Sequence, residues 1–426
     1  MRRISATVVV ILCLTLMSFS QTFRGAINGS VTDPSGAVVA GASVKATNVA
    51  TGVNIEATTT SDGQFAFQDL PLGTYKITVA AAGFHTTTVD KIEVTAGSAY
   101  TLPVKLTVGG TGTTAVEVSA AALTLDTTTA AQDNVLTTEA VQDVPMNGRD
   151  FSQLIAVQPG YGGYSVGGFG SLNGTRANQM NWQIDGVDNN DFWHNIPAVN
   201  QGGVSGIAGT IMPLDAVDEF SAQTQSNAEG GRNAGGLVNV VLKSGTNQLH
   251  GSAYYFNRNE AFGDASPFTP DGVKKPELRN QNYGFSLGGP IIKDKTFWFV
   301  SFEKQQYVIG LSGVATEPSV AYQNEALAIL ANAGGVYGGY APVTPSSIST
   351  QLIANLWPST IDNLAANVNN FFSPVASTGY SYNGVAKIDH NFTDKHHLAV
   401  RWFAGQGSQT APLGGSPALA TASSNL

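Results

Sequence analysis

Cysteine is almost absent from this sequence, since Cys13 is the single one among 426 residues. It lies in an apolar stretch, residues 6–17, that follows Arg2 and Arg3. A basic start followed by a short apolar core predicts a secretory signal peptide over residues 1–20. The exported chain then has no cysteine, which excludes disulfides, thiol catalysis and cysteine metal sites.

Charged residues are scarce as well. Asp, Glu, Lys and Arg make up 12% of the sequence, about half their share in an average soluble domain. The 21 basic and 30 acidic residues give a formal net charge of −9, and the basic ones form no cluster beyond pairs such as Lys274 and Lys275. Binding to nucleic acid requires clustered Lys and Arg, so a nucleic-acid partner is excluded.

Long apolar runs are also missing. After the N-terminus no run approaches the roughly 18 residues that a membrane-spanning helix needs. The mean hydropathy is near zero, whereas glycine reaches 48 residues. This composition is typical of membrane β-strands, in which apolar positions alternate with polar ones.

The sequence shows no recognisable catalytic motif. GxSxG and Walker loops are absent, and the glycine-rich residues 167–170 are not followed by a βαβ pattern. None of the histidines begins an HxxE or HExxH pattern; they are His85, His194, His250, His390, His396 and His397. We therefore expect no enzyme activity, no catalytic residue, no metal site and no cofactor.

Short β-rich runs with turn signals about every ten residues occupy residues 21–108. Residues 33–36 (DPSG) and 61–63 (SDG) are turn signals, and the neighbouring runs carry Phe65, Phe67 and Tyr75. Seven such runs predict a β-sandwich. Residues 109–121 follow as a linker that begins with glycine and threonine.

Residues 122–247 predict a small α/β domain. Thr137 or Thr138 can cap a short helix over residues 139–143, and residues 151–155 give a second helical face. Trp182 and Ile184 lead into an Asp185-Gly186 turn, which predicts a hairpin. Further along, residues 213–220 predict a helix and residues 221–225 a strand.

The acidic residues of this domain invite a calcium interpretation. Asp185, Asp188 and Asp191 lie close together with Asn189 and Asn190, and calcium prefers such oxygen ligands. The spacing is not that of an EF-hand, and Asx residues are common in turns for backbone reasons. We therefore expect no metal here.

From residue 249 onward, two-faced strands predict a membrane β-barrel. Tyr283, Phe285 and Leu287 share one face of a strand, as do Leu398, Val400 and Trp402. The links alternate between tight turns and long loops; the tight turns are residues 289–295 and 390–396, and the long loops are residues 259–281 and 305–379, with a helix at 325–332. Such asymmetry fits a barrel with two different sides. Phe297, Trp298 and Phe299 belong either to an aromatic girdle or to a packed core.

The residues resemble a known family at this point. GGLVNVVLK, residues 235–243, is similar to the end of the plug domain of TonB-dependent outer-membrane receptors, and VPMNGRDFSQL and QIDGVDNND resemble the Oar-like branch. Residues 21–108 resemble a carboxypeptidase regulatory-like domain, which has a carbohydrate-binding-like fold. The resemblance implies a mainly β protein with a transthyretin-like or immunoglobulin-like sandwich, a plug at 122–247 and the first strands of a transmembrane antiparallel β-barrel at 248–426.

The resemblance also implies a function and site residues. Val116, Glu117, Val118 and Ser119 resemble a TonB box, which a periplasmic energy-transducing protein captures by strand addition; the alternative is a last strand of the sandwich. Arg149 and Arg232 are candidate anchors between plug and barrel, with surface arginine as the alternative. The remaining residues implied by the plug motif are Asp185, Gly186, Gly235, Gly236, Asn239 and Lys243.

The expected function is therefore transport of an external small molecule, glycan or peptide across the outer membrane. The alternative is an adhesion or carbohydrate-binding protein that uses the N-terminal sandwich and is anchored in outer-membrane lipid. An exopeptidase is opposed by the missing zinc ligands. Receptor barrels of this kind have about 22 strands, and five are visible here, so we expect the chain to be a fragment or a truncated product.

Overall fold

The computed structural model describes most of the chain from Arg24 onward. The described ranges are 24–109, 116–119, 133–146, 149–164, 170–192, 194–197, 212–224, 233, 235–263, 275–310, 314–315, 318–331, 342–356, 371–372, 376–393, 396–412 and 423–425. The predicted signal peptide, most of the predicted linker and Arg232 lie outside these residues.

The N-terminal sandwich consists of two sheets, ordered β4-β1-β7 and β3-β2-β5-β6-β8. Alternate side chains of each strand point inward and form one core with Ile27, Phe67 and Tyr75, all nearly inaccessible to solvent. The seven predicted strands are confirmed. Their bounds are β1 Gly25–Thr32, β2 Ser43–Asn48, β3 Asn54–Thr58, β4 Gln64–Leu70, β5 Gly73–Ala80, β6 Thr87–Val94 and β7 Ala99–Lys105, with β8 at Val116–Ser119.

The central domain is built on a five-stranded sheet, ordered β13-β12-β15-β14-β9. Its core includes Phe151, Trp182 and Phe220, whose rings meet edge to face. The elements are β9 Asp133–Leu136, α2 Thr138–Asp143, η2 Phe151–Val157, β10 Tyr161–Tyr164, β11 Gly170–Leu172, η4 Ala177–Gln179, β12 Asn181–Ile184, β13 Val187–Asp188, η5 Leu214–Ala216, β14 Val217–Gln223 and β15 Leu237–Leu242. The mixed α/β character that the sequence predicts is therefore present.

Two local predictions in this domain are wrong. Residues 213–220 do not form a helix: η5 gives one short turn, and β14 begins at Val217. The reason is tertiary, because β14 pairs with β15 on one side and with β9 on the other, and this pairing overrides local propensity. Thr137 holds the cap position of α2 without a side-chain cap bond, and Thr138 instead donates to Asp218.

A long antiparallel sheet covers the central domain, ordered β16-β17-β18-β21-β22-β23. Its neighbours in space follow chain order, as in a meander. The strands are β16 His250–Asn259, β17 Leu278–Ile292, β18 Thr296–Ile309, β21 Ser377–Thr393, β22 His396–Pro412 and β23 Ser423–Asn425. The remaining elements are η6 Glu260–Phe262, β19 Val314–Ala315, α3 Val320–Ala331, α5 Ser347–Leu356 and β20 Phe371–Phe372.

The two faces of the long sheet differ as the alternation predicts. Tyr283, Phe285 and Leu287 are exposed on its outer face, and Val400 and Trp402 are 52% and 64% exposed there. On the inner face, Phe299 and Val385 join the core of the central domain. Phe297 and Phe299 are nearly fully buried, so the aromatic-girdle interpretation is wrong for these two residues. Phe299 packs against the central domain instead, and Phe297 lines the cavity described below.

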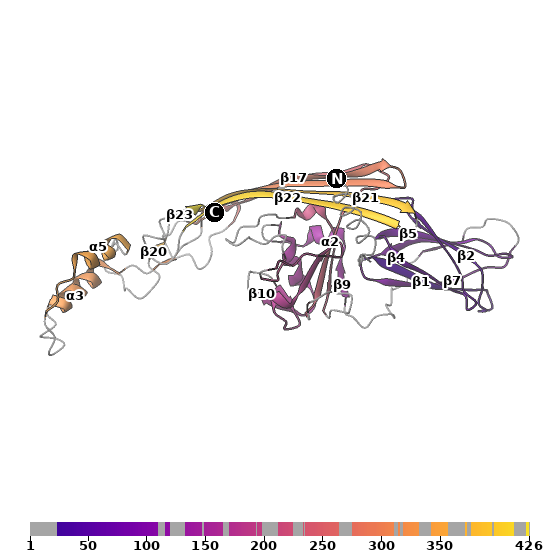
Figure 1. Cartoon of the computed structure of the whole chain (residues 1–426), viewed down its shortest axis with the longest axis horizontal. Coiled ribbons are helices and arrows are strands. Elements are labelled where there is room, and N and C mark those ends of the chain that lie inside the picture. Colours follow the sequence, from indigo (N-terminus) through magenta and orange to yellow (C-terminus); the bar gives the residue numbers. More distant parts are fainter. Residues whose placement is uncertain are drawn as a thin grey trace, which may run out of the picture.

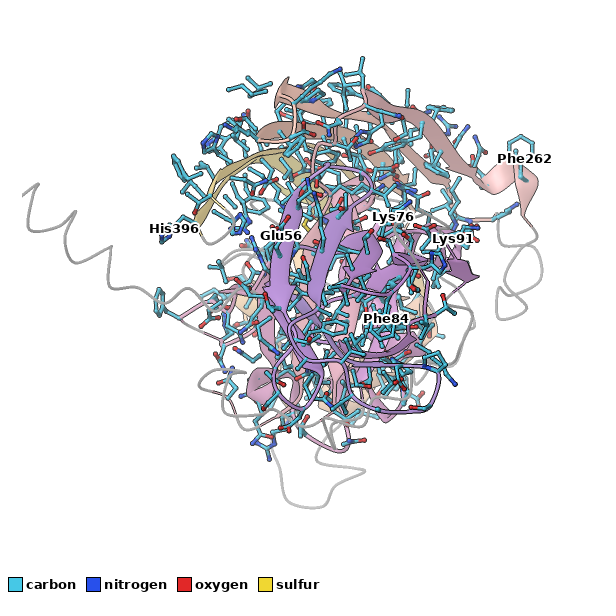
Figure 2. All side chains as sticks on the ribbon, turned by 90° about the vertical axis from the view of Figure 1, so that its right-hand side faces the viewer. Glu56, Lys76, Phe84, Lys91, Phe262 and His396 are labelled. Carbon is cyan, nitrogen blue, oxygen red and sulfur yellow. The ribbon has the colours of Figure 1, made fainter. Side chains whose placement is uncertain are left out.

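The two ends of the long sheet also differ (Figure 1). At one end the strands extend into the predicted tight turns at 289–295 and 390–396. Three residues therefore separate β17 from β18, and two separate β21 from β22. The N-terminal sandwich lies at this end, and α3 and α5 lie beyond the other end. Figure 2, viewed from the sandwich side, shows Glu56, Lys76 and Phe84 on the sandwich, with the sheet arching above and Phe262 and His396 near its margins.

Among the described residues of the long link between β18 and β21, two segments are helical, α3 and α5. The predicted helix at 325–332 is present as the longer α3, and α5 has no counterpart in the prediction. Within the part of the chain that the structure describes, no helix has both the length and the apolar character needed to cross a membrane.

Candidate functional site between the central domain and the long sheet

A buried carboxylate on the central domain joins it to the long sheet. Asp185 and Gly186 form the turn between β12 and β13, both with positive φ angles, 48° and 77°, as a two-residue hairpin turn of type I′ requires. The Asp185 Oδ2 atom lies 3.1 Å from Lys387 Nζ and 2.5 Å from Arg401 Nε. Its Oδ1 atom accepts a hydrogen bond from the Leu242 N–H at 2.8 Å.

Strand register explains why a carboxylate is needed at this place. Lys387 on β21 is the direct cross-strand partner of Arg401 on β22, and like charges directly opposite one another destabilise a sheet. Asp185 inserts between them and compensates both charges. Burial alone would raise the pKa of Asp185, but the Lys387 and Arg401 charges and the Leu242 hydrogen bond outweigh it, so this pKa lies below its usual range.

A second ion network centres on Arg149. Its guanidinium Nη2 lies 2.6 Å from Asp215 Oδ2 in the central domain, and its Nε lies 3.5 Å from Glu303 Oε2 on β18. The same guanidinium lies over the rings of Tyr254 and Phe256, 4.8 and 4.1 Å from their centroids. Arg149 therefore contacts the central domain and the long sheet together.

The acidic partners of Arg149 are fully hydrogen bonded. Glu303 accepts from the Tyr254 hydroxyl at 2.7 Å and from Asn282 Nδ2 at 2.8 Å. Asp215 accepts from the Ser252 hydroxyl at 3.1 Å. Buried charges are tolerated in proteins when they are paired and hydrogen bonded in this way.

The glycine-rich motif before β15 allows close packing. A Cβ on Gly235 would lie 2.5 Å from the Gln179 carbonyl oxygen, and one on Gly236 would lie 2.7 Å from the Gln223 carbonyl oxygen. Asn239, which is completely buried, accepts from the Gly186 N–H through Oδ1 at 3.0 Å. The motif therefore supports the turn that carries Asp185.

A cavity of about 560 Å³ lies where the sandwich, the central domain and the long sheet meet. Its lining includes Lys243, Asp215, Asp218, Lys387 and His397. Burial lowers the pKa of Lys243, although the charges of Asp215 and Asp218 act in the opposite direction. Lys243 thus belongs to the cavity and not to the two ion networks above.

The remaining predicted residues are distributed as follows. β8, Val116–Ser119, lies parallel to β6 at the edge of the sandwich, which corresponds to the alternative that these residues form its last strand. Their role as a TonB box stays a prediction. The Asp188 and Asp191 carboxylates accept backbone N–H groups of Asn190 and His194, and no group of metal ligands is found among the described residues.

Sequence reasoning missed the partners on the long sheet, Glu303, Lys387 and Arg401. The signal for them was present, because an ionisable residue at an inward position of an alternating strand needs a buried partner. Asp215 and Glu219 gave no comparable signal, since residues 213–220 were predicted to be helical.

The sandwich contacts the central domain through Glu219. Its Oε2 atom accepts the Ala96 N–H at 3.0 Å, in a junction where Glu219 is 7% exposed. Burial raises the pKa of Glu219 to about 7 from 4.5; the Ala96 hydrogen bond acts against this increase, and the nearby Asp218 and Glu93 charges add to it.

We expect this junction to weaken as the pH rises. Because the pKa of this acid is raised in the docked state, its contribution is complete below pH 4.5 and is lost as the pH rises through 7. At about pH 8 the loss amounts to roughly 3 kcal/mol. Proteolytic release of the sandwich from the protein, measured between about pH 5 and pH 8, checks the trend.

Glu219→Gln keeps an oxygen acceptor for the Ala96 N–H without the charge, so release should become independent of pH. Glu139→Gln, at an exposed position on α2, is the matched control and should behave as the unmodified protein does. An unchanged pH profile in Glu219→Gln would contradict the assignment.

Two family models match the chain. Residues 26–107 match the carboxypeptidase regulatory-like domain, and residues 241–425 match the outer membrane beta barrel domain. Among curated proteins, the TonB-dependent transporter Oar of Myxococcus xanthus is 29% identical over 168 residues, which cover 36% of this chain and 14% of that protein. The chain thus spans a small part of that relative's length.

The chain is also similar to parts of solved structures, all at low identity. The siderophore receptor PirA of Acinetobacter baumannii is 16% identical, with a TM-score of 0.36, and covers 65% of this chain and 31% of its own. The outer membrane transporter YddB of Escherichia coli is 11% identical, with a TM-score of 0.41, and covers 66% of this chain and 33% of its own.

Proposed function

Since this chain belongs to the TonB-dependent outer-membrane receptors, we propose that it binds an external ligand and admits it across the outer membrane, with the central domain as the plug. The observation that carries the proposal is the inner face of the long sheet, where Lys387, Arg401 and Glu303 meet buried charges of the central domain. A plug held by ion pairs can be displaced and returned, because such pairs form again once the charges meet. The proposed role is transport and not catalysis.

The outer face of the long sheet supports a place in the outer membrane. Its exposed residues are apolar or aromatic on successive strands, and they include Phe285 on β17, Tyr382 on β21 and Trp402 on β22. A face of this kind is suited to lipid. The short links at the sandwich end would then face the periplasm, since membrane barrels have their short turns on that side.

A charge placed on this face should impair insertion. We expect Val400→Arg to cost about 2–4 kcal/mol near the middle of the membrane and less toward its surfaces. The measurement is the folded fraction of the full-length receptor in outer-membrane vesicles. Val38→Arg, at a 56% exposed apolar position on the sandwich, is the control and should insert normally. Equal folded fractions for the two variants would contradict a lipid-facing role.

We propose that energy reaches the plug through Val116–Ser119. The segment is extended and lies at a sheet edge, and extended segments are captured by partner sheets through their backbone groups. The partner would be a TonB-type protein of the periplasm. In the sequence, residues 120–132 connect this segment to β9 of the central domain, so a pull on it would be transmitted there.

Deleting residues 115–120 from the full-length receptor should abolish energy-dependent uptake and leave insertion intact. The measurement compares accumulation of candidate ligands, such as an iron siderophore, an oligosaccharide or a peptide, with and without a protonophore. Deleting residues 34–36 of an exposed sandwich turn is a control that should leave uptake unchanged. Uptake that survives the first deletion would refute the assignment of this segment.

A further inference from the structure

The turn between β2 and β3 of the sandwich is shaped for a contact. The Asn48 side chain accepts the backbone N–H groups of Ala50 and Thr51, each at 3.0 Å, and the Gly52 N–H donates to the Asn48 carbonyl at 2.9 Å. These bonds fix the turn, and the carbonyl groups of Ala50 and Thr51 are left to be used elsewhere.

Asn247 receives both of these carbonyl groups. It lies between β15 and β16, and it donates its backbone N–H to the Ala50 carbonyl at 3.0 Å and its Nδ2 to the Thr51 carbonyl at 2.8 Å. The same side chain is held on the long sheet by Asp294, which donates its N–H to Asn247 Oδ1 at 2.9 Å and accepts from Nδ2 at 2.7 Å. Asn247 therefore joins the sandwich, the plug and the turn after β17.

The fit at this contact is tight. Gly52 has a φ angle of 72°, and a Cβ there would lie 2.2 Å from Asp294 Oδ1. The second contact, between the Ala96 N–H and Glu219, lies just after β6, at the same end of the sandwich but two strands away from β2. Two separate contacts fix the orientation of the sandwich as well as its position.

The seated sandwich forms part of the wall of the cavity, at the end with the short turns. Asn48, Thr51 and Leu72 of the sandwich line the cavity opposite Lys243 of the plug and Lys387 of the long sheet. Without the sandwich, the polar groups of that cavity would open to solvent at this end.

We propose that the N-terminal sandwich is a releasable cap, seated by Asn247 and Glu219, that closes the periplasmic side of the receptor until force unseats it. This inference rests on the proposed function. β8 connects the cap to the force, because it pairs with β6, and β6 leads within two residues to Ala96, which holds Glu219. A pull on β8 therefore loads the strand that holds the cap on the plug.

The test measures access to the cavity in the full-length receptor. Cys13 lies in the predicted signal peptide, so Ser244→Cys, at a position that lines the cavity, serves as the reporter in outer-membrane vesicles. The probe is a maleimide carried on a polyethylene glycol too large to enter the closed cavity. Asn247→Ala removes three side-chain hydrogen bonds, one of them to the sandwich and two to Asp294, and it should label roughly tenfold faster than the unmodified receptor.

Gln64→Ala, an exposed amide on β4 of the same sandwich, is the matched control and should label as slowly as the unmodified receptor. Asp294→Ala removes the support of Asn247 and the close contact with Gly52, while Asn247 keeps its own bonds to the sandwich. It replaces Asn247→Ala if that variant fails to insert. If Asn247→Ala and Asp294→Ala label at the rate of the control, the proposal that the sandwich is a cap is overturned.

A separate measurement tests the proposed energy-driven transport. In cells, labelling of the Ser244→Cys receptor should rise when the membrane is energised and fall when a protonophore is added. If this energy dependence is absent while Asn247→Ala still labels quickly, the result supports the sandwich as a cap and contradicts energy-driven transport. If energy dependence is present and Asn247→Ala has no effect on labelling, the result supports energy-driven transport and contradicts the sandwich as a cap.

Discussion

Replacing Asp185 by asparagine is expected to destabilise the contact between the central domain and the long sheet by about 3–5 kcal/mol, the usual cost of removing one partner from a buried ion network. Lys387 would remain 7% exposed and Arg401 21% exposed beside each other, without the carboxylate between them. Removing Asp185 thus exposes a repulsion between two like charges in addition to the loss of two ion pairs.

The measurement is pulse proteolysis of the full-length receptor in increasing urea, with detection of the central domain. Asp188→Asn, on the same hairpin but exposed, is the control and should shift the midpoint little. Asp185→Asn combined with Lys387→Gln should recover part of the loss, because one uncompensated cation is gone. Equal midpoints for Asp185→Asn and Asp188→Asn would contradict the network.

The pH dependence of this network has a definite sign. Because the pKa of Asp185 lies below 3.8 in the folded protein, its contribution is complete above that pH and is lost as the pH falls further. The Asp185 network and the Glu219 contact therefore respond to pH in opposite directions. The Asp185 network weakens as the pH falls, whereas the Glu219 contact weakens as the pH rises. Acid should loosen the plug from the sheet while it holds the cap in place.

Replacing Arg149 by alanine is the second change with a large expected effect. Asp215 and Glu303, 11% and 6% exposed, would lose the cation that lies between them. We expect a loss of about 3–5 kcal/mol from the stranded carboxylates, with roughly 0.5–2 kcal/mol more from the lost contacts to Tyr254 and Phe256.

Arg149→Lys tests how much of the effect comes from the positive charge of residue 149 and how much from the planar shape of its guanidinium. It keeps the cation but lacks the planar donor pair that reaches Asp215 and Glu303 and stacks on both rings, so we expect an intermediate loss. Arg279→Ala removes an exposed arginine that pairs with Glu260 and Glu277, and exposed pairs contribute about 1 kcal/mol or less. Urea midpoints that fall equally for Arg149→Ala and Arg279→Ala would disprove a buried anchor.

Local pattern was sufficient for the sandwich and for the faces of the long sheet. Alternation depends on a side-chain period of two residues, which is a property of the strand itself. The Asp185-Gly186 turn was readable for a similar reason, because only certain residues accept two successive positive φ angles. Residues 213–220 were misread because the deciding contacts, to β9 and β15, are far away along the chain.

The partners in the site could not be read from the sequence. Asp185 and Arg401 are separated by 216 positions, and Asn247 meets Thr51 across 196. Residue types show that a charge at an inward position needs a partner, but they do not show which one lies opposite. The outcome depends on register, since a shift of one residue would turn Lys387 to the outer face.

The sequence by itself determined the sandwich, the glycine-rich stretch before β15 and the strands with one apolar face, and it predicts export of a chain without cysteine. These features follow from interactions within a few residues. The tertiary structure alone decided that Asp185 lies between two cations, that Arg149 joins plug and sheet, and that the sandwich is seated on Asn247. The physical reason is that charges and hydrogen-bonding groups find their partners only when strand register and domain packing bring distant segments together.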